Sequence, residues 1–315
     1  MEAAFGSLEV AWDAPIEAFA GLPGWPGSLA EGIERFRAGR GRDPLPRLVR
    51  EARGGRGVLL PGDAPWPEGV RKLARPPLAL YWQGRGSLWR PLGQRRAVAV
   101  VGTRRPSRHG LTMARRLGAA LGENGWPVVS GLAEGIDGAA HQGCLERGGA
   151  PVGVLGTPLE RIYPRHHADL QRTVGNQGLL VSEQPPGSSV LAAHFANRNR
   201  LQVALAAAVV VVECPLMSGA LHSAELAWKE ELPLWVVPAD AGKCSAAGSN
   251  RLLARGATPL LTPADLIDQL GPGPLALRVR TLPSLRSDAG HEGAPDQERE
   301  AESRQAALLA AVGGG

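Results

Sequence analysis

Residues 98–110 read VAVVGTRRPSRHG: an apolar run, a glycine turn with adjacent arginines, and the start of a longer helical pattern. The run is short, continuous and rich in β-branched residues, which is typical of a strand covered on both faces. Apolar positions then recur with helical spacing as far as residue 122. This stretch therefore predicts a strand, a tight turn and a helix, the repeating unit of a parallel α/β sheet.

The same alternation runs through the middle of the chain. Predicted strands cover residues 97–102, 127–131, 151–155, 179–182, 209–213, 234–238 and 258–261. Predicted helices cover residues 108–122, 136–148, 167–175, 198–207, 220–231, 249–256 and 263–270. Alternating strands and helices predict a doubly wound, mostly parallel sheet of the extended Rossmann-like α/β class.

Three regions differ in composition. Residues 1–90 are rich in Pro, Gly and Trp with short helical patches, which indicates a small, partly helical N-terminal segment. Residues 91–271 carry the alternating pattern of the Rossmann-like domain. Residues 272–315 hold Pro, Gly, Ser, Asp and Glu with little apolar content, so we expect a disordered, flexible tail.

The charge is modest overall and uneven along the chain. The net charge is +5, and only three of the 35 basic residues are lysines. Seven arginines and no acidic residue lie between Arg95 and Gly122. A GC-rich genome explains the arginine total, whereas the local cluster fits either that bias or phosphate recognition by guanidinium groups.

Cysteine usage and hydropathy exclude several classes of protein. Three cysteines without paired spacing, Cys144, Cys214 and Cys244, favour free thiols over a disulfide framework or a metal site. The longest apolar run, Val203–Val212, is too short to span a bilayer, and the N-terminus has no signal-peptide pattern. We expect a cytoplasmic protein with no membrane partner and no metal.

The turn after the first predicted strand carries Gly102, Thr103, Arg104 and Ser107. Ligands of parallel sheets bind at the carboxyl ends of strands, where backbone N–H groups of a helix start favour an anion. The turn lacks the GxGxxG pattern of dinucleotide-binding proteins. It fits either an ordinary capped turn or, as we favour, a phosphate site with Arg104 as its anchor.

Two later turns combine glycine, aromatic and charged residues. In SGLAEGIDGAAH (130–141), we expect a structural role for Asp137, and a hydrogen-bonded pair with His141 one turn later rather than a catalytic pair. After the third strand, Tyr163 and Arg165 combine a stacking surface with a phosphate contact, which suits a single nucleic-acid strand. The adjacent His166 and His167 are a poor metal pair, and we expect them to be solvated.

The segment Asn197–Arg200, NRNR, is predicted to lie directly before an Ala-rich helix. Two arginines at a helix start oppose the helix macrodipole, so contacts with phosphates or base edges explain them better than a structural role. Glu213, at the end of the fifth predicted strand, is expected to tether Arg198 or Arg200.

Several motifs together resemble the DprA (Smf) family of DNA-processing proteins over residues 90–270. They are VAVVGTRRPSRHG (98–110), VVSGLAEGIDGAAHQGCLERGGAPVGVLGT (128–157), YPRHHADL (163–170), LLVSEQPPG (179–187), NRNR (197–200), VVVECPLMSGAL (210–221) and GATPLLTPADLI (256–267). The order and spacing of these motifs match the family. Departures are Ala196, where the family commonly has Pro, Ala204-Leu205-Ala206, where it has Gly-Leu-Ser, and Ala220, His222 and Ser223 within its SGSLIT motif.

The resemblance implies a non-enzymatic protein without metal or nucleotide cofactor that binds and protects single-stranded DNA in natural transformation and recombination. It further implies loading of the RecA recombinase and a homodimer. Arg104 and Arg165 match residues of the family's DNA-binding pocket, and the 130–133 turn and NRNR flank that pocket. The N-terminal helical domain looks shortened, and we expect no complete C-terminal winged-helix module.

The expected DNA-binding residues therefore come from five strand-end segments. They are Gly102, Thr103, Arg104, Ser130, Gly131, Leu132, Tyr163, Arg165, Phe195, Asn197, Arg198, Asn199, Arg200, Ser218 and Gly219.

Two other classes of function compete with this hypothesis. One is a nucleotide phosphoribohydrolase of the LOG-like group, whose PGGxGTxxE motif aligns on Glu225. Here the glutamate is present, but the second glycine pair and the threonine are missing. The other is an interaction scaffold, which leaves the donor-rich strand ends unexplained.

Overall fold

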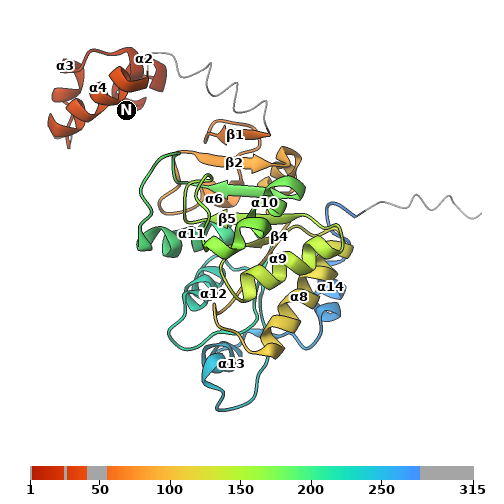
Figure 1. Cartoon of the computed structure of the whole chain (residues 1–315). Helices are drawn as coiled ribbons and strands as arrows, with labels where there is room; N and C mark the ends of the chain where they lie inside the picture. Colours follow the sequence, from red (N-terminus) through yellow and green to blue (C-terminus); the bar gives the residue numbers. More distant parts are fainter. Residues whose placement is uncertain (1, 25–26, 41–54, 277–315) are drawn as a thin grey trace, which may run out of the picture. The chain divides into compact units, whose positions relative to one another are not determined.

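The computed structural model of the chain describes residues 2–24, 27–40 and 55–276 (Figure 1). Within these residues, nine strands form one sheet in the order β1-β2-β6-β5-β4-β3-β7-β8-β9. The strands are β1 (Arg56–Leu59), β2 (Leu80–Gly84), β3 (Val98–Val101), β4 (Val128–Ser130), β5 (Pro151–Leu155), β6 (Leu179–Ser182), β7 (Ala208–Val211), β8 (Leu234–Val236) and β9 (Thr258–Pro259). From β6 to β9 every neighbouring pair is parallel, whereas β1 and β2 pair antiparallel.

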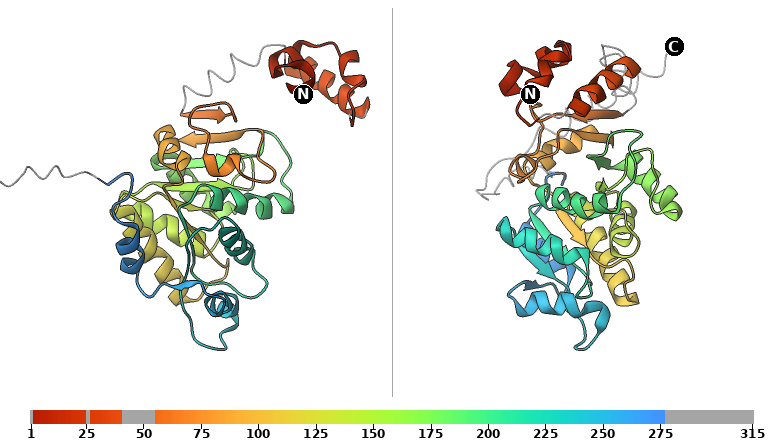
Figure 2. Two further views of the ribbon diagram at one scale, coloured as in Figure 1. Left: turned by 180° about the vertical axis from the view of Figure 1, so that it is seen from behind. Right: turned by 90° about the vertical axis from the view of Figure 1, so that its left-hand side faces the viewer.

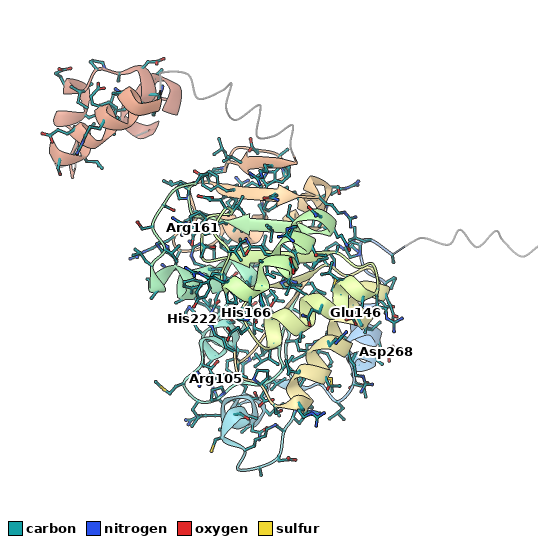
Figure 3. All side chains as sticks on the ribbon, in the orientation of Figure 1. Arg105, Glu146, Arg161, His166, His222 and Asp268 are labelled. Carbon is teal, nitrogen blue, oxygen red and sulfur yellow. The ribbon has the colours of Figure 1, made fainter. Side chains whose placement is uncertain are left out.

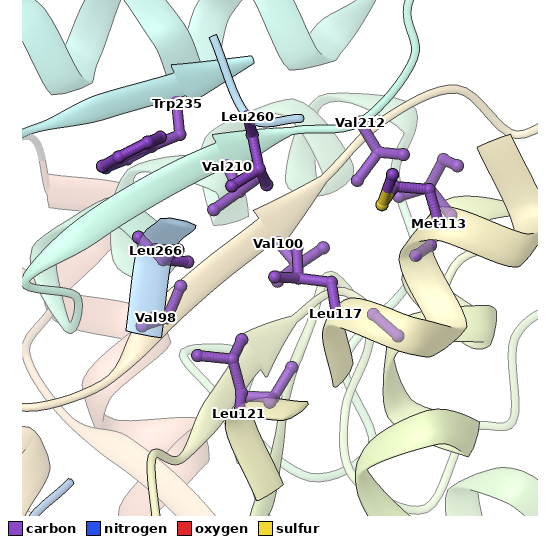
Figure 4. Close-up of a cluster of buried hydrophobic side chains, with 14 of the residues drawn as sticks. Val98, Val100, Met113, Leu117, Leu121, Val210, Val212, Trp235, Leu260 and Leu266 are labelled. Atoms are coloured by element: carbon purple, nitrogen blue, oxygen red, sulfur yellow. The ribbon is translucent and has the colours of Figure 1, made fainter. Parts of the chain in front are cut away.

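Helices cover both faces of the sheet, as the two views of Figure 2 show. The longer helices of this part are α8 (Arg108–Glu123), α9 (Ile136–Glu146), α10 (Ala168–Gln177), α11 (Ala192–Ala204), α12 (Gly219–Lys229), α13 (Ala247–Ala254) and α14 (Pro263–Leu270). Val98 and Val100 of β3 pack with α8, α9 and α14 in the layer of Figure 4. Ala99 and Val101 pack with α11, α12 and α13 on the other face. The predicted doubly wound α/β class is therefore confirmed.

The sheet begins earlier in the chain than residue 91. Leu80 of β2 and Trp89 lie in one apolar layer with Val152 of the central sheet, and β2 pairs with β6. The intervening short helices are α6 (Glu68–Arg71), η1 (Gly86–Leu88) and α7 (Trp89–Gly93). The sequence pattern did not predict β2, because LYWQG lacks a run of β-branched residues.

The N-terminal segment is helical over α1 (Glu2–Phe5), α2 (Leu8–Asp13), α3 (Glu17–Ala20) and α4 (Gly27–Arg40). Arg37 of α4 donates hydrogen bonds to the carbonyl oxygens of Ala11 (3.0 Å) and Ala14 (2.9 Å). Its guanidinium carbon also lies 5.4 Å from the ring centroid of Phe19. Arg37 therefore supplies partners for carbonyls that the end of α2 leaves free.

The segment after α14 is anchored as far as the structure describes it. The N–H of Gly273 donates to the carbonyl of Asn124 (2.8 Å), and the N–H of Leu275 donates to that of Gly125 (3.0 Å). The tail predicted for residues 272–315 lies outside the described residues from residue 277 onward. In the described ranges, none of the helices has the length and apolar character to cross a membrane.

Candidate nucleic-acid interface

A cleft of about 750 Å³ opens at the carboxyl ends of β3 and β7, near the middle of the sheet. β3 is flanked by β4 on one side and β7 on the other, so the strand order reverses here. This is the topological switch point, where open α/β sheets bind ligands. The walls come from the turn after β3, from α11, from the loop between β7 and α12, and from η3 (Cys244–Ala246).

The turn between β3 and α8 presents two exposed arginines at the cleft, Arg104 and Arg105. The Thr103 hydroxyl accepts a hydrogen bond from the N–H of Arg105 (3.2 Å), and Ser107 caps α8 by accepting from Gly110 N (3.2 Å). Among the described residues, neither arginine has a carboxylate within ion-pair distance. Their charges are therefore available to a ligand.

Glu213, just after the end of β7, fixes the turn between β3 and α8 through its buried carboxylate. It is 1 % exposed, accepts a hydrogen bond from the Ser107 hydroxyl (2.6 Å), and lies 3.7 Å from the Lys243 ammonium. Burial alone would raise the pKa of Glu213, but the Ser107 hydrogen bonds and the Lys243 charge lower it below its ordinary value. The prediction that Glu213 tethers Arg198 or Arg200 is wrong. It instead joins two cleft-forming loops.

Arg198 forms the floor of the cleft. It is 5 % exposed, and its Nη1 lies 3.8 Å from Oδ2 of Asp137, which also accepts a hydrogen bond from the N–H of Gly131 (3.1 Å). With its amide oxygen turned inward, Gln202 accepts from Arg198 Nη1 and from Gly131 N, each at 2.8 Å. A Cβ on Gly131 would lie 1.3 Å from Arg198 Nη1, so only glycine leaves room for the guanidinium.

The NRNR segment lies within a helix rather than before one. α11 begins at Ala192, so the predicted helix start at residue 198 is wrong. Leu191 N donates to the ring nitrogen Nδ1 of His194 (3.4 Å) at the true start. Arg200 makes a short ion pair with Glu183 outside the cleft lining, and Asn197 is exposed on the same helix. Of the four residues, only Arg198 and Asn199 line the cleft.

The predicted Asp137–His141 hydrogen bond is not formed. His141 is fully buried, and neither ring nitrogen has a hydrogen-bond partner among the described residues. Burial lowers the pKa of His141 to about 3, so the ring is neutral. The structural role expected for Asp137 rests instead on Gly131 and Arg198, and burial raises the pKa of its carboxyl.

Phe195 lines the cleft and contacts Tyr163, whereas Tyr163 and Arg165 lie outside the lining. The rings of Tyr163 and Phe195 lie 4.8 Å apart between centroids, and the Arg104 guanidinium lies 5.8 Å from the Phe195 ring. Tyr163 is 45 % exposed, and Arg165, the first residue of η2 (Arg165–His167), is exposed without an acidic partner in the described ranges. An aromatic surface thus lies beside free guanidinium groups.

The neighbouring histidines have different partners. His166 is exposed and lies 3.3 Å from the Glu134 carboxylate, whereas Nδ1 of His167 is 2.9 Å from the carbonyl of Leu132. The prediction of solvated rings fits His166 and is wrong for His167. Figure 3 places the labelled His166, His222 and Arg105, from three different strand-end segments, on one side of the view. No cluster of metal-ligating side chains occurs in the part of the chain that the structure describes.

The start of α12 forms the opposite wall. Ser218 caps the helix by accepting from Ala220 N (3.2 Å), and the Asn199 amide donates to the Gly219 carbonyl (3.2 Å). The free N–H groups of a helix start favour an anion. Glu225, the residue that aligns with the phosphoribohydrolase motif, is exposed, pairs with Arg255, and is absent from the cleft lining.

The structure brings about half of the predicted site residues to the cleft wall. These are Gly102, Thr103, Arg104, Phe195, Arg198, Asn199, Ser218 and Gly219. Ser130, Gly131 and Leu132 are buried beneath it, and Ser130 donates to the carbonyl of Val100 (2.6 Å). Sequence reasoning missed Gln202, although its i, i+4 spacing from Arg198 on a helix was a usable signal.

Comparison with known proteins agrees with the motifs. Residues 57–271 match the family model described as DNA recombination-mediator protein A. Protein Smf of Synechocystis sp. is 35 % identical over 271 residues, which cover 86 % of this chain and 68 % of that protein. Across the curated relatives it matches, the chain spans between 46 % and 70 % of their length.

Two solved structures share the fold. DNA processing protein A of Streptococcus pneumoniae has a TM-score of 0.67 at 28 % identity, covering 81 % of this chain and 84 % of that one. DNA processing protein A of Helicobacter pylori, described for its single-stranded DNA binding mode, has a TM-score of 0.61 at 30 % identity, covering 70 % and 97 %. The family model and these relatives show that this chain belongs to the DprA family of DNA recombination-mediator proteins.

Proposed function

We propose that the cleft binds the backbone of single-stranded DNA, and that the chain acts as a recombination mediator rather than an enzyme. The observation that carries this proposal is the set of free arginines at the cleft. Arg104 and Arg105 have no acidic partner among the described residues and lie opposite the start of α12. Guanidinium groups that the fold leaves unneutralised are the ones that gain most from a phosphate.

The division between paired and free arginines supports the assignment. Arg200 is paired with Glu183, and Arg115 of α8 with Glu146. Arg104 instead lies 5.8 Å from the Phe195 ring, which contacts that of Tyr163, and Arg165 follows Tyr163 by two positions in the chain. Alternating charges and aromatic faces suit unpaired bases with their phosphates, because each exposed base offers a π-face that a duplex conceals.

The finer role is proposed from family membership. Within the cytoplasm, the chain would protect incoming strands in natural transformation as a homodimer and load RecA onto them. Support comes from the match to the recombination-mediator family and from the single-stranded DNA binding described for the Helicobacter pylori relative. Loading is measured as the rate of RecA filament assembly on coated strands. A rate that this chain does not change would contradict the role.

Binding of labelled oligo-dT and of a matched duplex across a salt series tests the main proposal. Arg104→Ala should weaken oligo-dT binding and reduce the slope of log affinity against log salt by about 0.7, the value for one lost phosphate contact on a single strand. Arg115→Ala, which removes a paired arginine of the adjacent helix, is the matched control. Equal affinity for duplex, or unchanged binding by Arg104→Ala, would refute the assignment.

The phosphoribohydrolase alternative is tested directly. We expect no free adenine when the chain is incubated with AMP, because Glu225 is held by Arg255 away from the cleft. Release of adenine that is lost in Glu225→Gln would favour the enzyme over the mediator.

A further inference from the structure

A second cavity, of about 520 Å³, lies at the far end of the sheet between the β1–β2 edge and α7. β2 is separated from β3 by β6, β5 and β4, which at the usual strand spacing places it about 19 Å from the strand that leads into the cleft. Figure 1 shows β1 and β2 at one end of the sheet and α13 at the other. The cavity is therefore separate from the cleft.

An indole ring forms one wall of this cavity. Trp82 pairs with Gly57 across the two strands, and a Cβ on Gly57 would lie 2.7 Å from the ring. A Cβ on Gly86 would lie 3.0 Å from it. The two glycines thus leave space for the ring to lie against the backbone, while the half-buried ring lines the cavity. The ring also packs against the apolar layer that contains Leu80 and Trp89, and its exposed part faces the cavity.

The remaining lining is suited to a planar, partly polar group. Ala64 and Pro65 are apolar, Ser87 offers a hydroxyl, and Arg90 offers an exposed guanidinium. Asp63 also lines the cavity, and its carboxylate accepts a hydrogen bond from the N–H of Leu60 (2.7 Å).

The chain segment that forms this end of the sheet is rich in arginine. Residues 56–96 contain eight basic and two acidic residues. Of the basic residues, Lys72 pairs with Glu68 and Arg95 with Glu230. Arg56, Arg71, Arg75, Arg90 and Arg96 have no carboxylate within ion-pair distance in the described ranges. In the cavity itself, an indole ring lies with an unpaired arginine, Arg90, and this combination suits a base and its phosphate.

We infer that this cavity is a second nucleotide site, in which Trp82 stacks on one base of single-stranded DNA and Arg90 contacts its phosphate. The inference rests on the proposed function for its DNA ligand but uses none of the cleft residues. It deepens that function, because a strand held at two separated places is bound over a longer stretch than the cleft alone accommodates.

Photo-crosslinking with oligo-dT that carries 5-bromouracil tests the site in the full chain. We expect adducts on Trp82 in addition to adducts on Phe195, which lines the cleft. Arg90→Ala should lower the Trp82 adduct and leave the cleft adducts unchanged. Arg75→Ala removes one positive charge from the same chain segment, but Arg75 does not line the cavity. This control should leave the yields of the Trp82 adduct and of the cleft adducts unchanged. Competition by thymidine monophosphate distinguishes a free nucleotide from one within a strand.

Affinity gives an independent measurement. Trp82→Leu should weaken binding of long oligo-dT by roughly 5- to 150-fold, the range for one stacked base, and leave short oligo-dT in the cleft unaffected. Arg90 is exposed and unpaired, so Arg90→Ala folds even if Trp82→Leu does not. Cleft adducts without a Trp82 adduct overturn the inference alone. A Trp82 adduct without cleft adducts overturns the cleft assignment alone, and no adduct anywhere overturns both.

Discussion

Replacing Gly131 with alanine should destabilise the fold at one defined point. The added Cβ would lie 1.3 Å from Nη1 and 2.1 Å from Cζ of Arg198, far inside any contact distance. The guanidinium would have to leave a buried site where Asp137 and Gln202 hold it. Because this movement strands the Asp137 carboxylate without its partner, we expect a loss of about 3–5 kcal/mol in the free energy of unfolding.

Denaturant unfolding at pH 7, followed by tryptophan fluorescence, measures this loss. Gly62→Ala is the matched control, because nothing lies within 4 Å of its added Cβ, and we expect a change within about 0.5 kcal/mol. The total stability of a domain is about 5–15 kcal/mol, so the loss expected for Gly131→Ala is a large and measurable fraction of it. If both variants unfold at the same midpoint with the same slope, Arg198 moves freely and the fixed floor of the cleft is refuted.

Three further predictions follow from other contacts. Glu213→Gln should lower the free energy of unfolding by about 2 kcal/mol at pH 7. Because the folded state lowers the pKa of Glu213, the stabilisation by its carboxylate is present above pH about 4.5 and disappears in acid. A stability difference from wild type that persists at low pH would contradict the ion-pair role. Iodoacetamide at pH 8 should modify exposed Cys244 first, because burial raises the pKa of Cys144 to about 12 and that of Cys214 to about 11. Peptide mapping that finds equal modification rates for the three cysteines would disprove this. Trp126→Phe removes the 2.8 Å hydrogen bond from the ring N–H to the Gly271 carbonyl and should lower the free energy of unfolding by about 1 kcal/mol. An unchanged thermal unfolding temperature would show that this bond does not stabilise the segment after α14.

Periodicity predicted the parallel part of the fold well. Each of the seven expected strands corresponds to one of β3 to β9, because short β-branched runs between helical segments have few other interpretations. β1 and β2 were missed because their stabilisation comes from packing against α7 and pairing with β6, which no local pattern records. The N-cap residue of α11 is Leu191, which is not a preferred capping type, whereas Asn197 is, so local signals do not indicate the true start of the helix.

The candidate site was predictable in position but not in the role of each arginine. Strand ends with glycine turns locate the cleft, and Arg104 is exposed there as expected. Which carboxylate neutralises which arginine depends on distances across the fold: Asp137, 61 positions before Arg198, reaches it, whereas Glu213 does not. The sequence shows which residues are charged, but only the folded structure shows which arginines are paired with a carboxylate.

The buried pair beneath the cleft also affects the entropy of binding. Arg198 is already confined by Asp137 and Gln202 before any ligand arrives, so its guanidinium keeps one position at the floor of the cleft. Arg104, exposed at the rim, would have to be ordered in the proposed complex, at a cost of about 0.5–1.5 kcal/mol. The cleft thus combines a fixed, paired guanidinium at its floor with an adaptable, unpaired one at its rim. Under the proposed function, the rim arginine follows the irregular path of an unpaired strand.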